Sequence, residues 1–200
     1  MSASVRPVTR VASLIVVLAL TAGGCSDGDQ AAAPPAPSSS ESSSTAAAPK
    51  PVRTKLTVGT VTGHLPKKEQ RRVVETAGRV VDRWFEAAYL GDDYPRRRVD
   101  NAFAGFTPGA RAQAHADRAL LTNQDIARRI DAATAKRRRV QVDVLAVRGR
   151  AAGLTARFTL DLATTGKVTR KVRVRGRLFL TRTERGWQVF GYDVSKGGRR

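Results

Sequence analysis

Apolar residues recur every three or four positions between residues 65 and 90. This is the spacing of one face of an α-helix, and the residues are Val73, Ala77, Val80, Val81, Trp84 and Ala88. Pro66 suits the first position of a helix, and Gly91 suits the position after its end. The pattern therefore predicts a one-sided helix that ends at Leu90.

Two shorter helices are predicted next. The Thr-Pro pair at 107–108 is typical of a helix start, and the helical stretch continues to Leu121. Thr122 and Asp125 resemble a capping box for a third helix, which should end at Ile130. Both helices are expected to cover one face of a sheet.

From Arg139 onward the period changes to strict alternation, which is typical of strands. Gly153, Gly166 and Gly186 are taken as the turns, so we expect a four-stranded antiparallel meander that closes with residues 187–194. The apolar residues that share one side in the first three strands are Val140, Val142, Val144, Ala146, Leu154, Ala156, Phe158, Leu160, Leu162, Val172, Val174, Leu178 and Leu180.

The loop length agrees with this meander. Facing residues of a hairpin share one side of the sheet, so two even-numbered apolar sets require a loop of odd length. Thr164-Thr165-Gly166 supplies one, with Gly in the last position, where a left-handed residue is usual. The closing strand has apolar residues on both faces, and the pattern does not assign its inward side.

The N-terminal segment has the layout of an export signal. Arg6 and Arg10 come first, without any acidic residue, and an apolar stretch and several small residues follow. As a helix, residues 11–24 would be about 21 Å long, which is too short for a hydrocarbon core of about 30 Å. We therefore expect a cleaved signal rather than a membrane span.

The run Ala22-Gly23-Gly24-Cys25 resembles the lipobox of bacterial lipoproteins, although Ala22 stands where the family more often has Leu. The resemblance implies that Cys25 is the lipid attachment site, carries a diacylglycerol and becomes the first residue after cleavage. The alternative is ordinary signal cleavage that leaves Cys25 as a free thiol.

A biased segment separates this anchor from the rest of the chain. Between residues 26 and 50, eighteen of 25 residues are Ser, Ala or Pro, and none is aromatic. Such a segment buries too little apolar surface to offset its chain entropy. The expected organisation is a signal peptide at 1–24, a lipidated cysteine and disordered linker at 25–56, one α+β domain at 57–196 and a basic tail at 197–200.

The chain is strongly basic, with 36 Lys and Arg against 17 acidic residues. Such a charge favours anionic surfaces and polyanions. The strand parity places five cations on the side opposite the apolar residues: Arg157, Lys171, Arg173, Arg175 and Arg177. They form either an anion-binding strip or a solvated face that Asp143 and Asp161 partly neutralise. No aromatic residues interleave with the arginines, so anionic lipid or wall polymers suit the strip better than nucleic acid.

Helices followed by a meander that closes on Gly186-Trp187 and Tyr192-Asp193-Val194 resemble the NTF2-like (cystatin-type α+β) superfamily. In particular, the chain is similar to small secreted domains found with Mce-type lipid-import systems. The resemblance implies a curved sheet around a long helix that leaves a cone-shaped pocket. Some members are enzymes and others are docking modules. The pocket candidates are Trp84, Tyr89, Phe158, Tyr192 and Asp193.

Catalytic signatures are absent from the sequence. The two histidines, His64 and His115, and the single cysteine are too few for a usual metal site. There is no Gly-rich phosphate loop and no Gly-x-Ser-x-Gly elbow. We therefore expect no catalytic residue, no metal and no cofactor.

These features favour an exported lipoprotein on the outer face of the cytoplasmic membrane. Its non-catalytic domain would dock an anionic lipid or an envelope protein, with lipid transport as a candidate process. The alternatives are an enzyme of isomerase or dehydratase type and a carrier of a small apolar ligand. The sequence determines neither the partner nor the oligomeric state.

Overall fold

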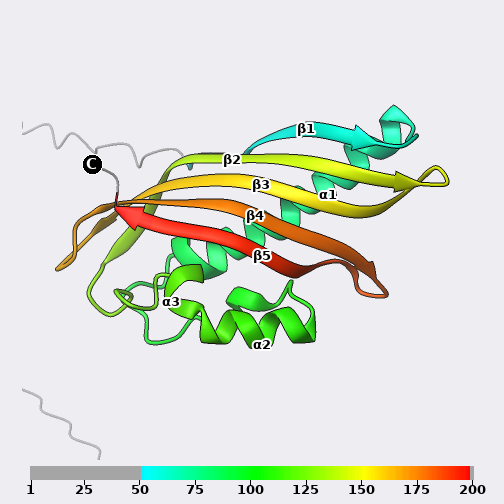
Figure 1. Ribbon diagram of the computed structural model, residues 1–200. Coiled ribbons are helices and arrows are strands. Elements are labelled where there is room, and N and C mark those ends of the chain that lie inside the picture. The colour runs from blue at the N-terminus through cyan, green and yellow to red at the C-terminus, as the bar shows by residue number, and fades with distance from the viewer. Residues whose placement is uncertain (1–50, 199–200) are drawn as a thin grey trace, which may run out of the picture. The chain divides into compact units, whose positions relative to one another are not determined.

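The computed structural model describes residues 51–198, whose strands form one sheet in the order β1-β2-β3-β4-β5 (Figure 1). Strands β2 to β5 pair antiparallel in succession, whereas β1 pairs in parallel with β2. The predicted α+β class and meander are present, but the mixed sheet has five strands rather than four. The strands are β1 (Lys55–Thr62), β2 (Ala132–Val147), β3 (Arg150–Thr165), β4 (Lys171–Thr183) and β5 (Gly186–Gly198).

Strand β1 was missed because none of its residues is buried and its apolar residues, Leu56, Val58 and Val61, do not keep a strict alternation. It is rich in Val and Thr, which fit a strand, but it lies at the sheet edge. Gly78 of the first helix gives it room, since a Cβ there would lie 2.8 Å from Leu56 Cδ2. The linker predicted to run to residue 56 therefore overlaps the start of the sheet.

The long helix agrees with its prediction. Helix α1 (Lys67–Phe85) continues into a wider π-type turn, η1 (Glu86–Leu90), so the helical path ends at Leu90. The Gly91 N–H donates to the Glu86 carbonyl at 2.9 Å and closes this turn. All six apolar residues of the predicted helical face are buried.

The helices after α1 are shorter than predicted. Helix α2 (Pro108–Ala116) begins as expected, with the Thr107 hydroxyl accepting from the Ala110 N–H, and α3 (Arg118–Leu121) follows. A 3-10 turn, η2 (Asp100–Phe103), precedes them. The third helix predicted at 122–130 is wrong, because these residues form successive turns.

Tertiary contacts explain those turns. The Asn123 N–H donates to the Ala88 carbonyl at the end of the long helix instead of supporting a new one. The Asp125 carboxylate, predicted to cap a helix, accepts from Lys196 of β5 at 2.9 Å and from Arg170 at 3.0 Å. These partners are distant in sequence, so no local pattern reveals them.

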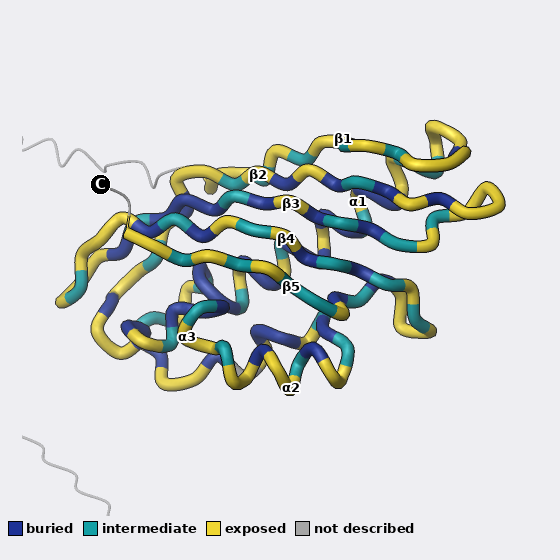
Figure 2. Tube along the Cα trace, viewed as in Figure 1, coloured by how far each residue is buried: buried dark blue, intermediate teal, exposed yellow. Residues whose placement is uncertain are grey.

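The core lies between the helices and one face of the sheet. Helix α1 crosses behind the strands, and α2 and α3 lie along β5 (Figure 1). Figure 2 shows buried positions alternating with exposed ones along the strands, and the apolar residues predicted to face inward are buried. Within residues 51–198, no helix covers the opposite face, which we call the outer face of the sheet.

The predicted parity holds, although all three turns differ; the last lies at residues 184–185, and Gly186 begins β5. Leu160 pairs with Val174, so even-numbered residues face one another between β3 and β4. The connecting loop is residues 166–170, longer than predicted but also odd in length. The first turn is not at Gly153, which lies within β3; it is at residues 148–149, where Arg148 and Gly149 have φ of 50° and 73°. Positive φ at both turn residues is typical of a two-residue hairpin.

A bulge explains why β5 has apolar residues on both faces. Gly191 pairs with Phe179 and Val189 pairs with Leu180, so Phe190 is an extra residue that is 54% exposed. The inward positions are therefore odd-numbered up to Val189 and even-numbered from Tyr192 onward. The strand extends to Gly198, so the predicted basic tail at 197–200 begins too early.

Candidate functional site

Three of the five pocket candidates pack against one another in the core. The Trp84 ring lies 5.5 Å from that of Tyr89 and 5.1 Å from that of Phe158, nearly perpendicular to both. Such edge-to-face pairs contribute about 0.5–1.5 kcal/mol each beyond burial. Burial also raises the pKa of Tyr89 well above its ordinary value, and its hydroxyl donates to the Leu120 carbonyl. The space between α1 and the sheet is therefore filled here by aromatic rings.

The other two candidates point to opposite sides of β5. The Tyr192 hydroxyl donates to Asp117 Oδ2 at 2.6 Å on the helical side, and burial, aided by Asp117, raises the pKa of Tyr192. Asp193 is exposed and accepts from Arg177 Nη2 at 2.5 Å on the outer face. The five candidates therefore do not converge on one pocket.

The five cations of the predicted strip all lie on the outer face, as their parity requires. Arg157 stands opposite Arg177, and Arg173 stands opposite Asp161. Side chains of Arg137 and Arg139 on β2 and of Lys55 on β1 extend this basic face; the sequence prediction did not include them. The alternation of β2 would have placed the two arginines on this face. Lys55 could not be placed from the sequence, because strand β1 was not predicted.

Three carboxylates pair with the strip. Arg157 Nε donates to Asp143 Oδ2 at 2.7 Å, and Arg177 donates to Asp193. Arg173 binds the buried Asp161 through two nitrogens, at 2.6 and 3.0 Å, and this hydrogen bonding raises the pKa of Arg173. Lys171 and Arg175 have no carboxylate partner within the described chain; Arg175 Nε donates to the Ser195 hydroxyl, which in turn donates to the backbone carbonyl of Arg175.

A shallow hollow of about 330 Å³ lies on this face across β1, β2 and β3. Lys55, Arg139 and Arg157 line it together with the polar side chains of Thr57, Gln141 and Thr159, and its lining contains no acidic residue. A concave surface that brings cations and hydroxyl groups together suits an anion such as a phosphate group.

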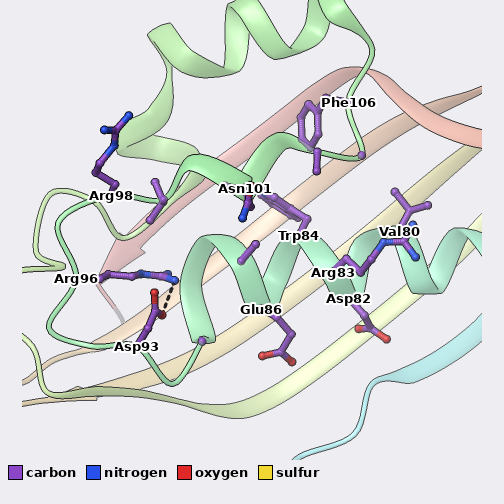
Figure 3. Close-up of a pocket in the computed structure, with 16 residues that line it drawn as sticks. Val80, Asp82, Arg83, Trp84, Glu86, Asp93, Arg96, Arg98, Asn101 and Phe106 are labelled. Atoms are coloured by element: carbon purple, nitrogen blue, oxygen red, sulfur yellow. Dashed lines mark hydrogen bonds and ion pairs between the residues drawn. The ribbon is translucent and has the colours of Figure 1, made fainter. Parts of the chain in front are cut away.

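A larger cleft of about 750 Å³ lies on the helical side (Figure 3). Helix α1 forms one wall with Val80 and Trp84, and the segment 91–106 forms the other with Val99 and Phe106. These four side chains are each less than a tenth exposed. The widened turn η1 borders the cleft through Glu86 and Ala87.

Arg96 lies buried at one end of this cleft, beside Asp93 (Figure 3). Its Nη1 donates to Asp93 Oδ1 at 3.0 Å and its Nη2 donates to the Tyr94 hydroxyl at 2.8 Å. The Tyr94 hydroxyl in turn donates to the Tyr89 carbonyl. Burial, opposed by Arg96, raises the pKa of Tyr94. This chain of bonds fixes the loop against the end of the long helix.

Lys196, a partly buried cation, has a structural role. Lys196 Nζ donates to the carbonyls of Ala119 and Thr122 and to Asp125. Burial lowers the pKa of Lys196, whereas Asp125 opposes that shift. Burial alone would raise the pKa of Asp125, but its bonds to Lys196 and Arg170 lower it. Lys196 therefore joins α3 to β5 and is not free to bind an external anion.

No metal-ligand cluster of His, Cys, Asp and Glu occurs in residues 51–198. His64 and His115 are both exposed, and the His115 ring contacts that of Phe103 at 5.2 Å. No helix in the same range is long and apolar enough to cross a membrane.

The chain matches no protein-family model, no curated protein and no solved structure. The resemblance to NTF2-like domains therefore remains a prediction from the sequence.

Proposed function

We propose that this protein is a membrane-tethered, non-catalytic envelope lipoprotein whose domain docks on an anionic lipid surface through the outer face of its sheet. The proposed anchor, Cys25, lies outside the described residues and rests on the lipobox-like sequence. The domain is proposed as an NTF2-like variant in which aromatic rings fill the space between α1 and the sheet.

The observation that carries the proposal is the basic hollow lined by Lys55, Arg139 and Arg157. It lies on the face that no helix covers within the described residues, so a flat partner can approach it. Arg175 and Lys171 add cations on the same face that no described carboxylate neutralises.

The strength of such docking can be estimated. Each basic residue near an anionic membrane contributes about 1 kcal/mol, and the attraction decays over about 8 Å at physiological salt. One or two cations therefore bind weakly, whereas a flat basic face binds through several at once. A lipid anchor would keep this face close to the surface. It would thereby remove most of the free-energy cost of bringing the domain to the membrane.

Vesicle binding tests the proposal with the Cys25→Ser chain, which lacks the anchor. Replacing Lys55, Arg139 and Arg175 by Gln should weaken binding to phosphatidylglycerol vesicles by about 100-fold, because three contributions of about 1 kcal/mol are lost. Added salt should also weaken vesicle binding by the chain whose outer face is unaltered.

The matched control removes three cations from exposed positions on α1, by Lys67→Gln, Arg71→Gln and Arg79→Gln. It changes the net charge equally but leaves the outer face intact, so binding should fall much less. Equal losses in the two triple variants, or equal binding to neutral and anionic vesicles, would show that the outer face is only a solvated surface.

A further inference from the structure

We infer that the cleft between α1 and the segment 91–106 binds a small amphipathic molecule with an apolar body and an anionic head group. The cleft lies apart from the outer face of the sheet, and Trp84 is the boundary between the cleft and the filled space between α1 and the strands. The inference therefore adds a ligand site to the proposed docking surface and does not depend on it.

The size and walls of the cleft suit such a molecule. Its volume of about 750 Å³ lies within the range of about 300–1,000 Å³ that is typical of small-molecule sites. Val80, Trp84, Val99 and Phe106 provide apolar walls. The two walls approach each other at Gly105, where a Cβ would lie 3.4 Å from Val80 Cγ1.

Two buried donors at the cleft lack acceptors. Trp84 and Arg96 both line it, and Trp84 Nε1 and Arg96 Nε have no hydrogen-bond partner in the structure. A buried donor without an acceptor costs about 1–3 kcal/mol, so native proteins seldom leave one unpaired. A ligand oxygen that reached either nitrogen would supply it with an acceptor.

One exposed cation at the cleft is available to an anionic head group. Asp82 and Glu86 extend away from Trp84 in Figure 3, and both pair with Arg138, at 3.0 and 2.5 Å. Asp93 pairs with Arg96. Each acidic residue of the lining is thus paired with an arginine, while Arg83 remains exposed at the cleft and forms no ion pair within the described chain. Arg83 is therefore the cation at the cleft that can pair with an anionic head group.

The probe for this site is 8-anilinonaphthalene-1-sulfonate, which joins an apolar aromatic body to an anionic group. Its neutral analogue N-phenyl-1-naphthylamine has the same body without the sulfonate. Calorimetry with the Cys25→Ser chain should give one site for the sulfonate and weaker binding of the neutral analogue. Arg83→Gln should weaken binding of the sulfonate several-fold and leave binding of the neutral analogue unchanged. Arg79→Gln, one helical turn away, should change the binding of neither probe.

A cleft-filling variant locates the site. Ala87 is half-buried at the cleft, so Ala87→Phe should reduce binding of both probes at least tenfold, which is about 1.4 kcal/mol. Ala112→Phe, on the exposed side of α2, is the matched control and should bind both probes normally. Circular dichroism checks that each variant is folded.

Fluorescence gives a second readout. The chain has two tryptophans, so Trp187→Phe leaves Trp84 as the only donor for energy transfer to the bound sulfonate. Efficient transfer in this variant supports the site beside Trp84. Unchanged affinity in Ala87→Phe, or identical affinities for the charged and neutral probes, would overturn the inference, and either result would leave the vesicle experiment unaffected.

Discussion

Asp161, only 2% exposed, accepts two hydrogen bonds from Arg173 on the neighbouring strand, through Nε at 2.6 Å and Nη2 at 3.0 Å. Arg137 lies farther from the same carboxylate, at 3.7 Å. A central cation of the predicted strip is therefore committed to a buried acid, and it serves the stability of the sheet as well as its surface charge.

Arg173→Ala should lower the thermal midpoint of unfolding more than Arg175→Ala does. The first change removes two hydrogen bonds to a buried carboxylate, whereas Arg175 contacts no carboxylate. Adding Asp161→Asn to Arg173→Ala should recover part of the loss, because the buried negative charge is then removed. Differential scanning calorimetry measures all three, and equal midpoints for the two arginine variants would contradict the assignment.

Gly176→Ala should destabilise the fold by about 2 kcal/mol or more, since it forces a side chain into a strained backbone position. Gly176 has φ of 154°, and a Cβ there would overlap the Asp193 carbonyl on β5. Gly153→Ala is the matched control, because a Cβ at Gly153 meets nothing within 4 Å. It should change stability by less than about 1 kcal/mol, toward greater stability. Urea unfolding distinguishes the two, and similar effects would argue against the close approach of β4 and β5.

The protein should lose stability as the pH rises above 10. Burial is the main cause that raises the pKa of Tyr89, Tyr94 and Tyr192, which are all the tyrosines of the chain. The folded state then keeps phenolic protons that the unfolded state releases near pH 10, so rising pH favours unfolding. Tyrosinate absorbance should therefore appear together with loss of the circular dichroism signal. Titration of all three tyrosines near pH 10 in a chain that stays folded would refute this.

Cys25→Ser should move the protein from the membrane fraction to the medium, or leave an unprocessed precursor, because the thiol is the proposed site of lipid attachment. Cell fractionation followed by mass spectrometry of the N-terminus measures both outcomes. A Cys25→Ser protein that is cleaved normally and stays membrane-bound would contradict the anchor.

Local periodicity was enough to predict the long helix and the facing of three strands. Their apolar residues repeat at the spacing of the element itself. The burial of Val140 and Val174 on the inward side of their strands follows from that repeat. The same parity placed Arg157 and Arg175 on the outer face. The third helix failed because the polar groups of Asn123 and Asp125 bond to residues far along the chain.

What the sequence determined by itself is therefore the part encoded by side-chain spacing: the α+β class, the meander and the basic side of its strands. Only the tertiary structure decided the rest. Strand β1 forms because β2 offers an edge to pair with, and the bulge at Phe190 reverses the facing of β5. The cleft beside Trp84 exists because α1 and the segment 91–106, which have no common periodicity, enclose a space that neither fills.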